Sequence, residues 1–435
     1  MQPHSRALVA TILASAGALA PPAVGAQQAQ TAPSAFSAAL AQRADVKAAL
    51  AHLDAGFPKQ VEEWIRIAEM QGKSEHEQER GAYIRAEMQK AGLEVSTDSI
   101  GNVTGRRKGT GGGPTMVFAA HLDIVHPLGT KLGVSRVGDT LKAPGIFDNS
   151  ASLANMLAVV RALRAAGIRT RGDLVFVTTT QEELGLRGMD YWLEHNPRPD
   201  LLVAMDGGLG PINYGALGIY WSRYHLSSAG SHTVTSRGKP TPVRALAAAI
   251  DGIYRLAPPP LPDGAVFNVG QVHGGDIFNG IPQELYFTMD LRSPDPVLLD
   301  SLDASIDRIV ADAAAGAGVK WRRETVTRNR AGGTEAMLRE ARRHPLVQSA
   351  IDIHRFLGID IGSSGREAVA SGSTDANMGV VRKIPSISVG RSFGGNQHTL
   401  SEWAHWPSAL PASKMVLLLA TTMSEATAKG STVIP

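Results

Sequence analysis

Two adjacent glutamates, Glu182 and Glu183, follow the apolar run at residues 174–177 in the stretch TTTQEELGLRG. Neighbouring carboxylates at the end of a buried strand repel each other, and one of them must face the interior. This arrangement costs stability unless a positive charge lies nearby. The pair therefore predicts a bound cation, with one glutamate as a ligand and the other left free.

Acids and histidines also stand where other predicted strands end. Ligands bind at the carboxyl ends of the strands in an open parallel sheet. Each residue alone has an ordinary explanation as a turn or helix cap, but their convergence favours a hard or borderline divalent metal. The chain has no cysteine, which excludes thiolate ligands and disulfides. The residues are His121 and Asp123 after TMVFAA, Asp148 in GIFDNS, Asp206 after LLVAM, and His398 after GRSFGGNQ.

Strands and amphipathic helices alternate along most of the chain and must position these side chains. Continuous apolar strands between such helices favour an α/β fold, with a mixed, largely parallel sheet and helices on both faces. The spacing of apolar residues predicts helices over residues 59–70, 76–90 and 152–167. Buried strands are predicted at residues 115–120, 174–180, 201–206 and 384–390.

The pattern changes between residues 223 and 343, where the predicted elements follow the order β-α-β-β-α-β. This is the order of the split ferredoxin-like unit. We therefore expect an inserted α+β domain at residues 223–343, between the two parts of the domain that carries the candidate site, residues 56–222 and 344–435. The alanine- and glutamine-rich residues 27–55 are expected to form a linker.

The first 26 residues have one arginine before an apolar stretch that two prolines interrupt and small residues end. This pattern predicts a cleavable secretory signal, because a membrane anchor needs about 20 apolar residues. We expect a periplasmic or secreted protein without a membrane span. A formal net charge of +3 over 435 residues, with no long basic run, argues against nucleic acid as a partner.

The motifs around these residues identify a family. After the leader, the chain resembles the dinuclear-zinc exopeptidases that include peptidase T, the glutamate carboxypeptidases, succinyl-diaminopimelate desuccinylase and the carnosinases. The resemblance implies two divalent ions, with zinc expected and manganese or cobalt as alternatives. The motifs, in order, are AAHLDIVHP, GIFDNS, TQEELGLRG, MDGG, SAGSHT, NVGQVHGGDIFNGIP, DLR, GSTDAN and NQHTLSEW.

Five residues match the metal ligands of this family. Asp148 would bridge both ions, His121 and Asp206 would complete one position, and Glu183 and His398 would complete the other. Two features depart from the family pattern: DNSAS lacks the usual lysine and glycine after the bridging acid, and Gln397 stands where a small residue is common. Neither feature touches a ligand, so they bear on the subfamily and leave metal binding as expected.

Five further residues match positions that act on the substrate. Asp123 would orient the imidazole of His121, and Glu182 would take the proton from the bridging water. The inserted domain resembles a lid and dimerisation domain, which predicts a homodimer. Its His232 would stabilise the oxyanion in a neighbouring site, and Asn279 and Arg292 would hold the substrate carboxylate. A surface histidine and a structural Arg–Asp pair are the alternatives for His232 and Arg292.

The leading hypothesis is an exported metallo-exopeptidase that cleaves short unblocked peptides. It rests on Asp206, because the family tends to have aspartate there in aminopeptidases and di- or tripeptidases, and glutamate in carboxypeptidases and deacylases. Asp375 of GSTDAN is a candidate partner for the substrate amino group, and Glu402 is either a buried partner of the site or an exposed helix acid. The alternatives are a carboxypeptidase or N-acyl amino acid hydrolase, or a non-catalytic binding protein. A serine or cysteine hydrolase is unsupported, because the chain has neither a cysteine nor a G-x-S-x-G motif.

Overall fold

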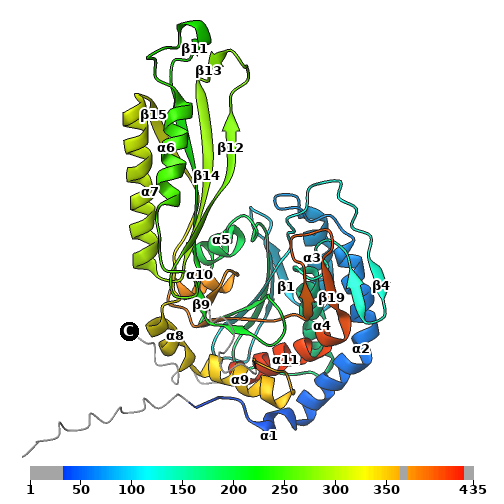
Figure 1. The fold of residues 1–435 in the computed structure, drawn as a ribbon. Coiled ribbons are helices and arrows are strands. Elements are labelled where there is room, and N and C mark those ends of the chain that lie inside the picture. The colour runs from blue at the N-terminus through cyan, green and yellow to red at the C-terminus, as the bar shows by residue number, and fades with distance from the viewer. Residues whose placement is uncertain (1–32, 363–370, 426–435) are drawn as a thin grey trace, which may run out of the picture. The chain divides into compact units, whose positions relative to one another are not determined.

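The computed structural model describes residues 33–362 and 371–425 (Figure 1). The predicted signal peptide, residues 1–26, lies outside the described residues. By its contacts, Ala32–Pro435 forms one compact unit. Among the described residues, no helix has both the length and the apolar character needed to cross a membrane.

A seven-stranded mixed sheet forms the centre of the fold. Its four inner strands run parallel, and antiparallel strands flank them on both sides. Every predicted buried strand is one of the inner four, so the expected α/β class with a mixed, largely parallel sheet is confirmed. In sheet order the strands are β1 (Glu94–Thr97), β2 (Val103–Arg107), β6 (Leu174–Thr179), β3 (Met116–His121), β7 (Leu201–Met205), β17 (Ser386–Val389) and β8 (Ile212–Asn213).

Side chains alternate between the two faces of this sheet because successive residues of a strand point in opposite directions. On one face, Phe118 and Phe176 stack with ring centroids 5.6 Å apart inside the main core, and on the other Val117 and Val177 pack against Trp192. The first face is covered by α2 (Ala44–Ala68), α3 (Gln78–Lys90), α4 (Ser150–Ala165), α9 (Pro345–Phe356) and α11 (Ala409–Glu425). The second is covered by α5 (Arg187–His195) and α10 (Ala376–Val380).

The predicted linker at residues 27–55 is wrong in its second half. A short helix, α1 (Ala38–Ala41), is followed by α2, which begins at Ala44 and continues through Pro58. Val46, Ala49 and Leu53 recur at helical spacing and are buried in the main core. The alanine-rich composition thus reflects a helix packed closely against its neighbours.

A second, four-stranded antiparallel sheet is formed within residues 218–329, which lie in the sequence between strands β8 and β17 of the central sheet. It carries two helices on one face, and Tyr224, Phe287 and Ile306 lie in the core between them. The element order is β-α-β-β-α-β, as expected, and the first strand begins at Gly218. That this region is an inserted lid domain stays a prediction. The strands in sheet order are β12 (Val266–Gly274), β14 (Glu284–Ser293), β10 (Gly218–Ser227) and β15 (Lys320–Asn329), and the helices are α6 (Pro242–Tyr254) and α7 (Pro296–Ala317).

Short strands complete the description and anchor the loops of the candidate site. A small four-stranded sheet places the chain before Asp148 beside the loop that carries His398. Its strands are β18 (Phe393–Gly395), β19 (Trp403–His405), β5 (Thr140–Lys142) and β4 (Ser135–Val137). The remaining elements are the pairs β9 (Gly215–Ala216) with β16 (Ser371–Gly372) and β11 (Ser231–His232) with β13 (Gly280–Ile281), and α8 (Glu335–Arg342).

Candidate active site

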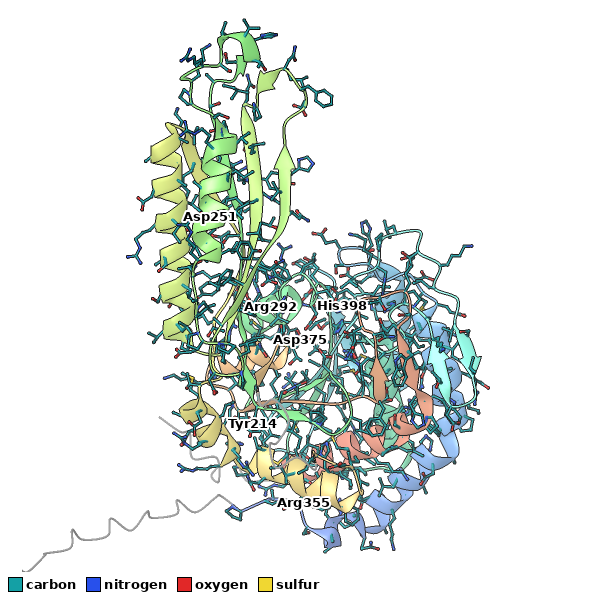
Figure 2. All side chains as sticks on the ribbon, viewed as in Figure 1. Tyr214, Asp251, Arg292, Arg355, Asp375 and His398 are labelled. Carbon is teal, nitrogen blue, oxygen red and sulfur yellow. The ribbon has the colours of Figure 1, made fainter. Side chains whose placement is uncertain are left out.

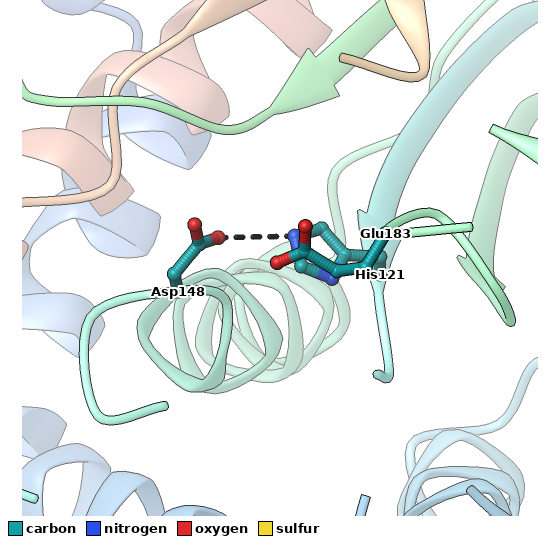
Figure 3. A group of neighbouring side chains, drawn as sticks. All are labelled: His121, Asp148 and Glu183. Carbon is teal, nitrogen blue, oxygen red and sulfur yellow. Dashed lines mark hydrogen bonds and ion pairs between the residues drawn. The ribbon is translucent and has the colours of Figure 1, made fainter. Parts of the chain in front are cut away.

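The strand ends bring His121, Asp148 and Glu183 together (Figure 3). His121 is the last residue of β3, Asp148 lies just before α4, and Glu183 lies in the loop after β6. One ligand atom from each residue lies within 4.8 Å of the others. The Nε2 atom of His121 is 3.1 Å from Oδ1 of Asp148. Three side chains from distant parts of the sequence thus face one point.

His398 approaches the same acids from the opposite side. Its Nε2 atom is 3.0 Å from Oε1 of Glu183 and 3.5 Å from Oδ2 of Asp148. The backbone φ of His398 is +63°, a left-handed conformation that is uncommon for a residue with a side chain. Such a conformation is found where the surroundings hold a residue in place for function.

Asp206 directly follows β7, and its Oδ2 atom is 4.0 Å from Nε2 of His121. Its other oxygen, Oδ1, accepts a hydrogen bond from Arg391. All five expected metal ligands are therefore linked by short contacts through Asp148 or His121. Arg391 stands two residues after β17 and was not among the site residues predicted from the sequence. The strand-end rule would have found it if cations had been considered together with acids and histidines.

Asp123 ties the loop that carries the two glutamates to the strand that carries His121. Its carboxylate accepts the backbone N–H groups of Glu182 at 3.0 Å and Glu183 at 3.1 Å, and the hydroxyl of Ser74 at 2.7 Å. Its Oδ1 atom is also 3.4 Å from Nδ1 of His121. One buried carboxylate thus orients the imidazole and fixes both glutamates, a wider role than the one expected from the sequence.

Glu402 is buried and lies just before β19, so it is not an exposed helix acid. Its carboxylate accepts the backbone N–H groups of Phe147 and Asp148, both at 2.8 Å, and that of Gly145 at 3.1 Å. These three bonds hold the turn that presents the Asp148 side chain. The sequence alone left this role open.

Gly185 allows the second sheet to approach the loop of the two glutamates. Its φ is +95°, and a Cβ atom there would lie 2.4 Å from Oγ1 of Thr327. The side-chain amide of Asn329 donates to the carbonyl of Gly185 at 2.9 Å. A glycine is therefore required where β15 meets this loop.

The surroundings of the site shift the pKa values of Glu182 and Asp148 in opposite directions. Burial raises the pKa of Glu182 well above its ordinary value, and nearby carboxylates add to the effect against the attraction of His121. Burial also opposes ionisation of Asp148, but Arg391, His121 and His398 outweigh it and hold the pKa of Asp148 well below its ordinary value. Hydrogen bonds to Asp148 and Glu183 raise the pKa of His398 to about 10. Among these acids, Asp148 is therefore the one whose ionised form its neighbours favour.

Asp375 lies close to the expected metal ligands but has different hydrogen-bond partners (Figure 2). Its Oδ2 atom accepts the hydroxyl of Thr179 at 2.6 Å, while Oδ1 is buried and has no hydrogen-bond partner among the described residues. Burial raises the pKa of Asp375 to about 7, and the Thr179 hydroxyl limits the rise. A buried carboxylate oxygen without a partner costs stability unless a ligand supplies a donor.

The residue expected to stabilise the oxyanion, His232, lies on β11, and the two expected substrate-binding residues, Asn279 and Arg292, lie just before β13 and on β14. His232 is exposed on β11, and its Nε2 atom is 3.4 Å from Nδ2 of Asn279. Arg292, near the end of β14, forms hydrogen bonds of 3.0–3.2 Å with Asp290 (Figure 2). No contact among the described residues joins these three to the five expected metal ligands.

The donor set fits a divalent metal, because imidazole nitrogens and carboxylate oxygens converge from several strand ends and bury their charge there. Asp148 has one oxygen toward His121 and the other toward His398, the arrangement that a bridging carboxylate needs. His121, with its other ring nitrogen 3.0 Å from the carbonyl of Asp123, is oriented as a metal-binding histidine usually is.

Comparison with known proteins agrees with this geometry. The profile of peptidase family M20/M25/M40 matches residues 117–422. Carboxypeptidase G2 of a Pseudomonas species (strain RS-16) is 26% identical over 249 residues, which span 54% of this chain and 59% of that enzyme. The match thus covers less than two thirds of the relative.

Two solved structures share the fold. A Staphylococcus aureus tripeptidase superimposes with a TM-score of 0.68 at 19% identity, over 85% of this chain and 99% of the other. A dinuclear metal-binding peptidase of family M20 from Bacillus subtilis gives a TM-score of 0.61 at 18% identity, over 86% and 99%. The family resemblance inferred from the motifs is confirmed: this chain belongs to peptidase family M20/M25/M40.

Proposed function

We propose that this chain is an exported dinuclear exopeptidase that hydrolyses short peptides with a free amino terminus, with Glu182 as the general base. The observation that carries this proposal is the different placement of the two adjacent glutamates. The carboxylate of Glu183 contacts His398 and groups with His121 and Asp148. The carboxylate of Glu182 is buried beside them, and no hydrogen bond to it is recorded among the described residues.

The residues that would hold two ions are Asp148 between them, His121 and Asp206 at one, and Glu183 and His398 at the other. Bound divalent ions, with zinc expected and manganese or cobalt as alternatives, would acidify a shared water and polarise the scissile carbonyl. Asp123 holds His121 and both glutamates in place for this task.

Glu182 would then accept the proton of the attacking water and pass it to the leaving amine. A carboxyl group whose pKa is raised by burial is suited to this exchange, because it holds an accepted proton more firmly than an ordinary carboxylate. Its neighbour Glu183 cannot take this role, since its carboxylate is engaged with His398.

The preference for a free amino terminus rests on Asp206 and Asp375. Asp206 is shorter by one methylene than the glutamate common in carboxypeptidases and deacylases, which changes the room beside the ion. Asp375 offers a buried oxygen without a partner, and its charge acts on both Glu182 and Asp206. A substrate ammonium group would satisfy it.

Three parts of the proposal concern the chain as a whole. The N-terminal sequence pattern supports export to the periplasm or beyond. The second sheet would act as a lid, with a homodimer that brings His232 to the partner's site. Asn279 and Arg292 would hold the substrate carboxylate, for which Arg292 must exchange part of its pairing with Asp290.

A substrate panel tests the proposal. Purified enzyme with added Zn²⁺, Mn²⁺ or Co²⁺ is offered dipeptides, tripeptides, their N-acetylated forms and N-acyl amino acids. We expect hydrolysis of the unblocked peptides and loss of activity after chelation. A preference for N-blocked substrates with a free terminal carboxylate would favour the carboxypeptidase or N-acyl hydrolase alternative. Full activity without metal would rule out the mechanism.

A further inference from the structure

Arg391 is a buried cation inside the group of acids. Its side chain is almost completely buried, and its guanidinium lies 4.1 Å from the centre of the Phe147 ring. Its Nη2 atom is 3.0 Å from Oδ1 of Asp148, and Nη1 contacts Oδ1 of Asp206. Nη1 also lies 3.2 Å from Oδ1 of Asn149. A buried guanidinium is retained only when such partners offset its desolvation.

The contacts of Arg391 are confined to one side of the site. The Oδ1 atom of Asp206 contacts Arg391. Only Oδ2, which is 4.0 Å from Nε2 of His121, therefore remains available to bind an ion. Asp148 gives Oδ1 to Arg391 and His121, while Oδ2 faces His398. In the described parts of the chain, no contact joins Arg391 to Glu183 or His398.

The two expected metal positions therefore differ in charge. An ion held by His121 and Asp206 would bind the carboxylates of Asp148 and Asp206. Both of these carboxylates also contact the positive guanidinium of Arg391. An ion held by Glu183 and His398 shares only Asp148, through the oxygen that Arg391 does not touch. Like charges that share a ligand in a buried site repel each other strongly, because little water screens them.

We propose that Arg391 makes the two metal positions unequal: it restricts Asp206 to one metal-binding oxygen and weakens binding at the position of His121 and Asp206 relative to that of Glu183 and His398. This inference rests on the proposed two-metal site. Arg391 is a positioning residue in this role, since it acts through the carboxylates.

Manganese binding to the chelator-stripped enzyme tests the inference without reference to activity. Free Mn²⁺ is followed by electron paramagnetic resonance during a titration. We expect two ions per chain in two steps whose dissociation constants differ at least tenfold. Asp206→Asn should remove the weaker step, and Glu183→Gln the tighter one. Two equal steps in the parent enzyme would overturn the role of Arg391 and leave the two-metal proposal intact.

Two substitutions separate charge from packing. Arg391→Met, which keeps the length of the side chain without its charge, should reduce the ratio of the two constants to less than about threefold. Arg391→Lys keeps the charge and should preserve the ratio. Circular dichroism and the melting temperature check that each variant is folded, and if Arg391→Met does not fold, the parent titration still decides. An unchanged ratio in folded Arg391→Met contradicts the inference. A single bound ion in parent and variant alike contradicts both this inference and the two-metal site.

Discussion

The carboxylate of Asp123 accepts the backbone N–H of Glu182 at 3.0 Å, which explains how two adjacent acids can stand at the end of a buried strand. The same carboxylate accepts the N–H of Glu183, so both residues are fixed by their backbones and their side chains are free to diverge. One points to His398, and the other does not. This divergence is the basis of the first prediction.

Glu182→Gln should bind metal as the parent enzyme does and lose roughly 10²–10⁴-fold in turnover, the usual contribution of a positioned proton carrier. The glutamine keeps the volume and removes the base. Metal content by mass spectrometry and turnover on an unblocked dipeptide check this. Glu183→Gln is the matched control and should lose metal as well as activity. If Glu183→Gln keeps its metal and only turnover falls, the two roles are reversed.

The second prediction concerns His232, which is exposed on β11 with Asn279 beside it. In a homodimer this histidine would serve the partner's site, so His232→Ala should lower turnover and leave metal binding unchanged. Mixing His232→Ala with Glu182→Gln subunits should restore activity, because a mixed dimer combines an intact site with an intact histidine. Random mixing of equal amounts predicts recovery of about a quarter of the parent activity.

Light scattering of the parent enzyme gives the oligomeric state for this experiment. A monomer with full activity would contradict the dimer, and so would a mixture that regains no activity although both variants are folded and dimeric. In the latter case His232 would act within its own chain or not at all.

Much of the candidate site could be predicted from the sequence because parallel strands end on one edge of a sheet. From the sequence alone, this rule places His121, Glu183 and Asp206 at a common point. The rule does not predict the hydrogen-bond partners of an individual residue. The role of Glu402 therefore stayed open, and Arg391 was not among the predicted site residues. Their partners lie far away in the sequence: Phe147 is 255 positions from Glu402, and Asp206 is 185 positions from Arg391.

The linker at residues 27–55 shows a second limit of the sequence. Small residues such as Ala49 occur both in closely packed helices and in mobile segments. Composition alone does not distinguish a packed helix from a linker. Only the burial of Val46 and Leu53 in the main core shows which of these applies. The sequence likewise leaves two alternatives for Arg292, and the structure shows its pairing with Asp290.

The third prediction concerns stability in acid. Burial lowers the pKa of His344, the residue before α9, from 6.5 to about 4. The unfolded chain therefore binds a proton between pH 6.5 and 4 that the folded chain does not, so stability falls as the pH decreases through this range. The loss from this histidine amounts to about 3 kcal/mol.

His344→Asn should reduce this acid sensitivity. Asparagine can still accept the N–H of Leu346, which the imidazole now accepts at 3.1 Å. Urea unfolding of parent and variant at pH 7 and pH 4.5 measures the difference. His52→Asn, at an exposed position of α2, is the control for the exchange of a histidine for an asparagine. An identical pH dependence in His344→Asn and the parent would contradict the argument.

The last prediction concerns the end of the substrate that the enzyme recognises, and it rests on the buried Oδ1 atom of Asp375. Within the described parts of the chain this oxygen has no hydrogen-bond partner, whereas Oδ2 is held by Thr179 at 2.6 Å. A substrate ammonium group would supply the missing donor, so acetylating the peptide should leave a buried acid unpaired and cost at least tenfold in kcat/KM.

Asp375→Asn should remove most of that preference by slowing the unblocked peptide while changing the acetylated one little. Thr179→Val, which removes only the hydroxyl that holds the same carboxylate, should lower activity without reversing the preference. Measuring kcat/KM for one dipeptide and its acetylated form with all three proteins decides the matter. Equal losses on both substrates in Asp375→Asn would make Asp375 a structural residue. A parent enzyme that favours the acetylated peptide would instead point to a carboxypeptidase or an N-acyl amino acid hydrolase.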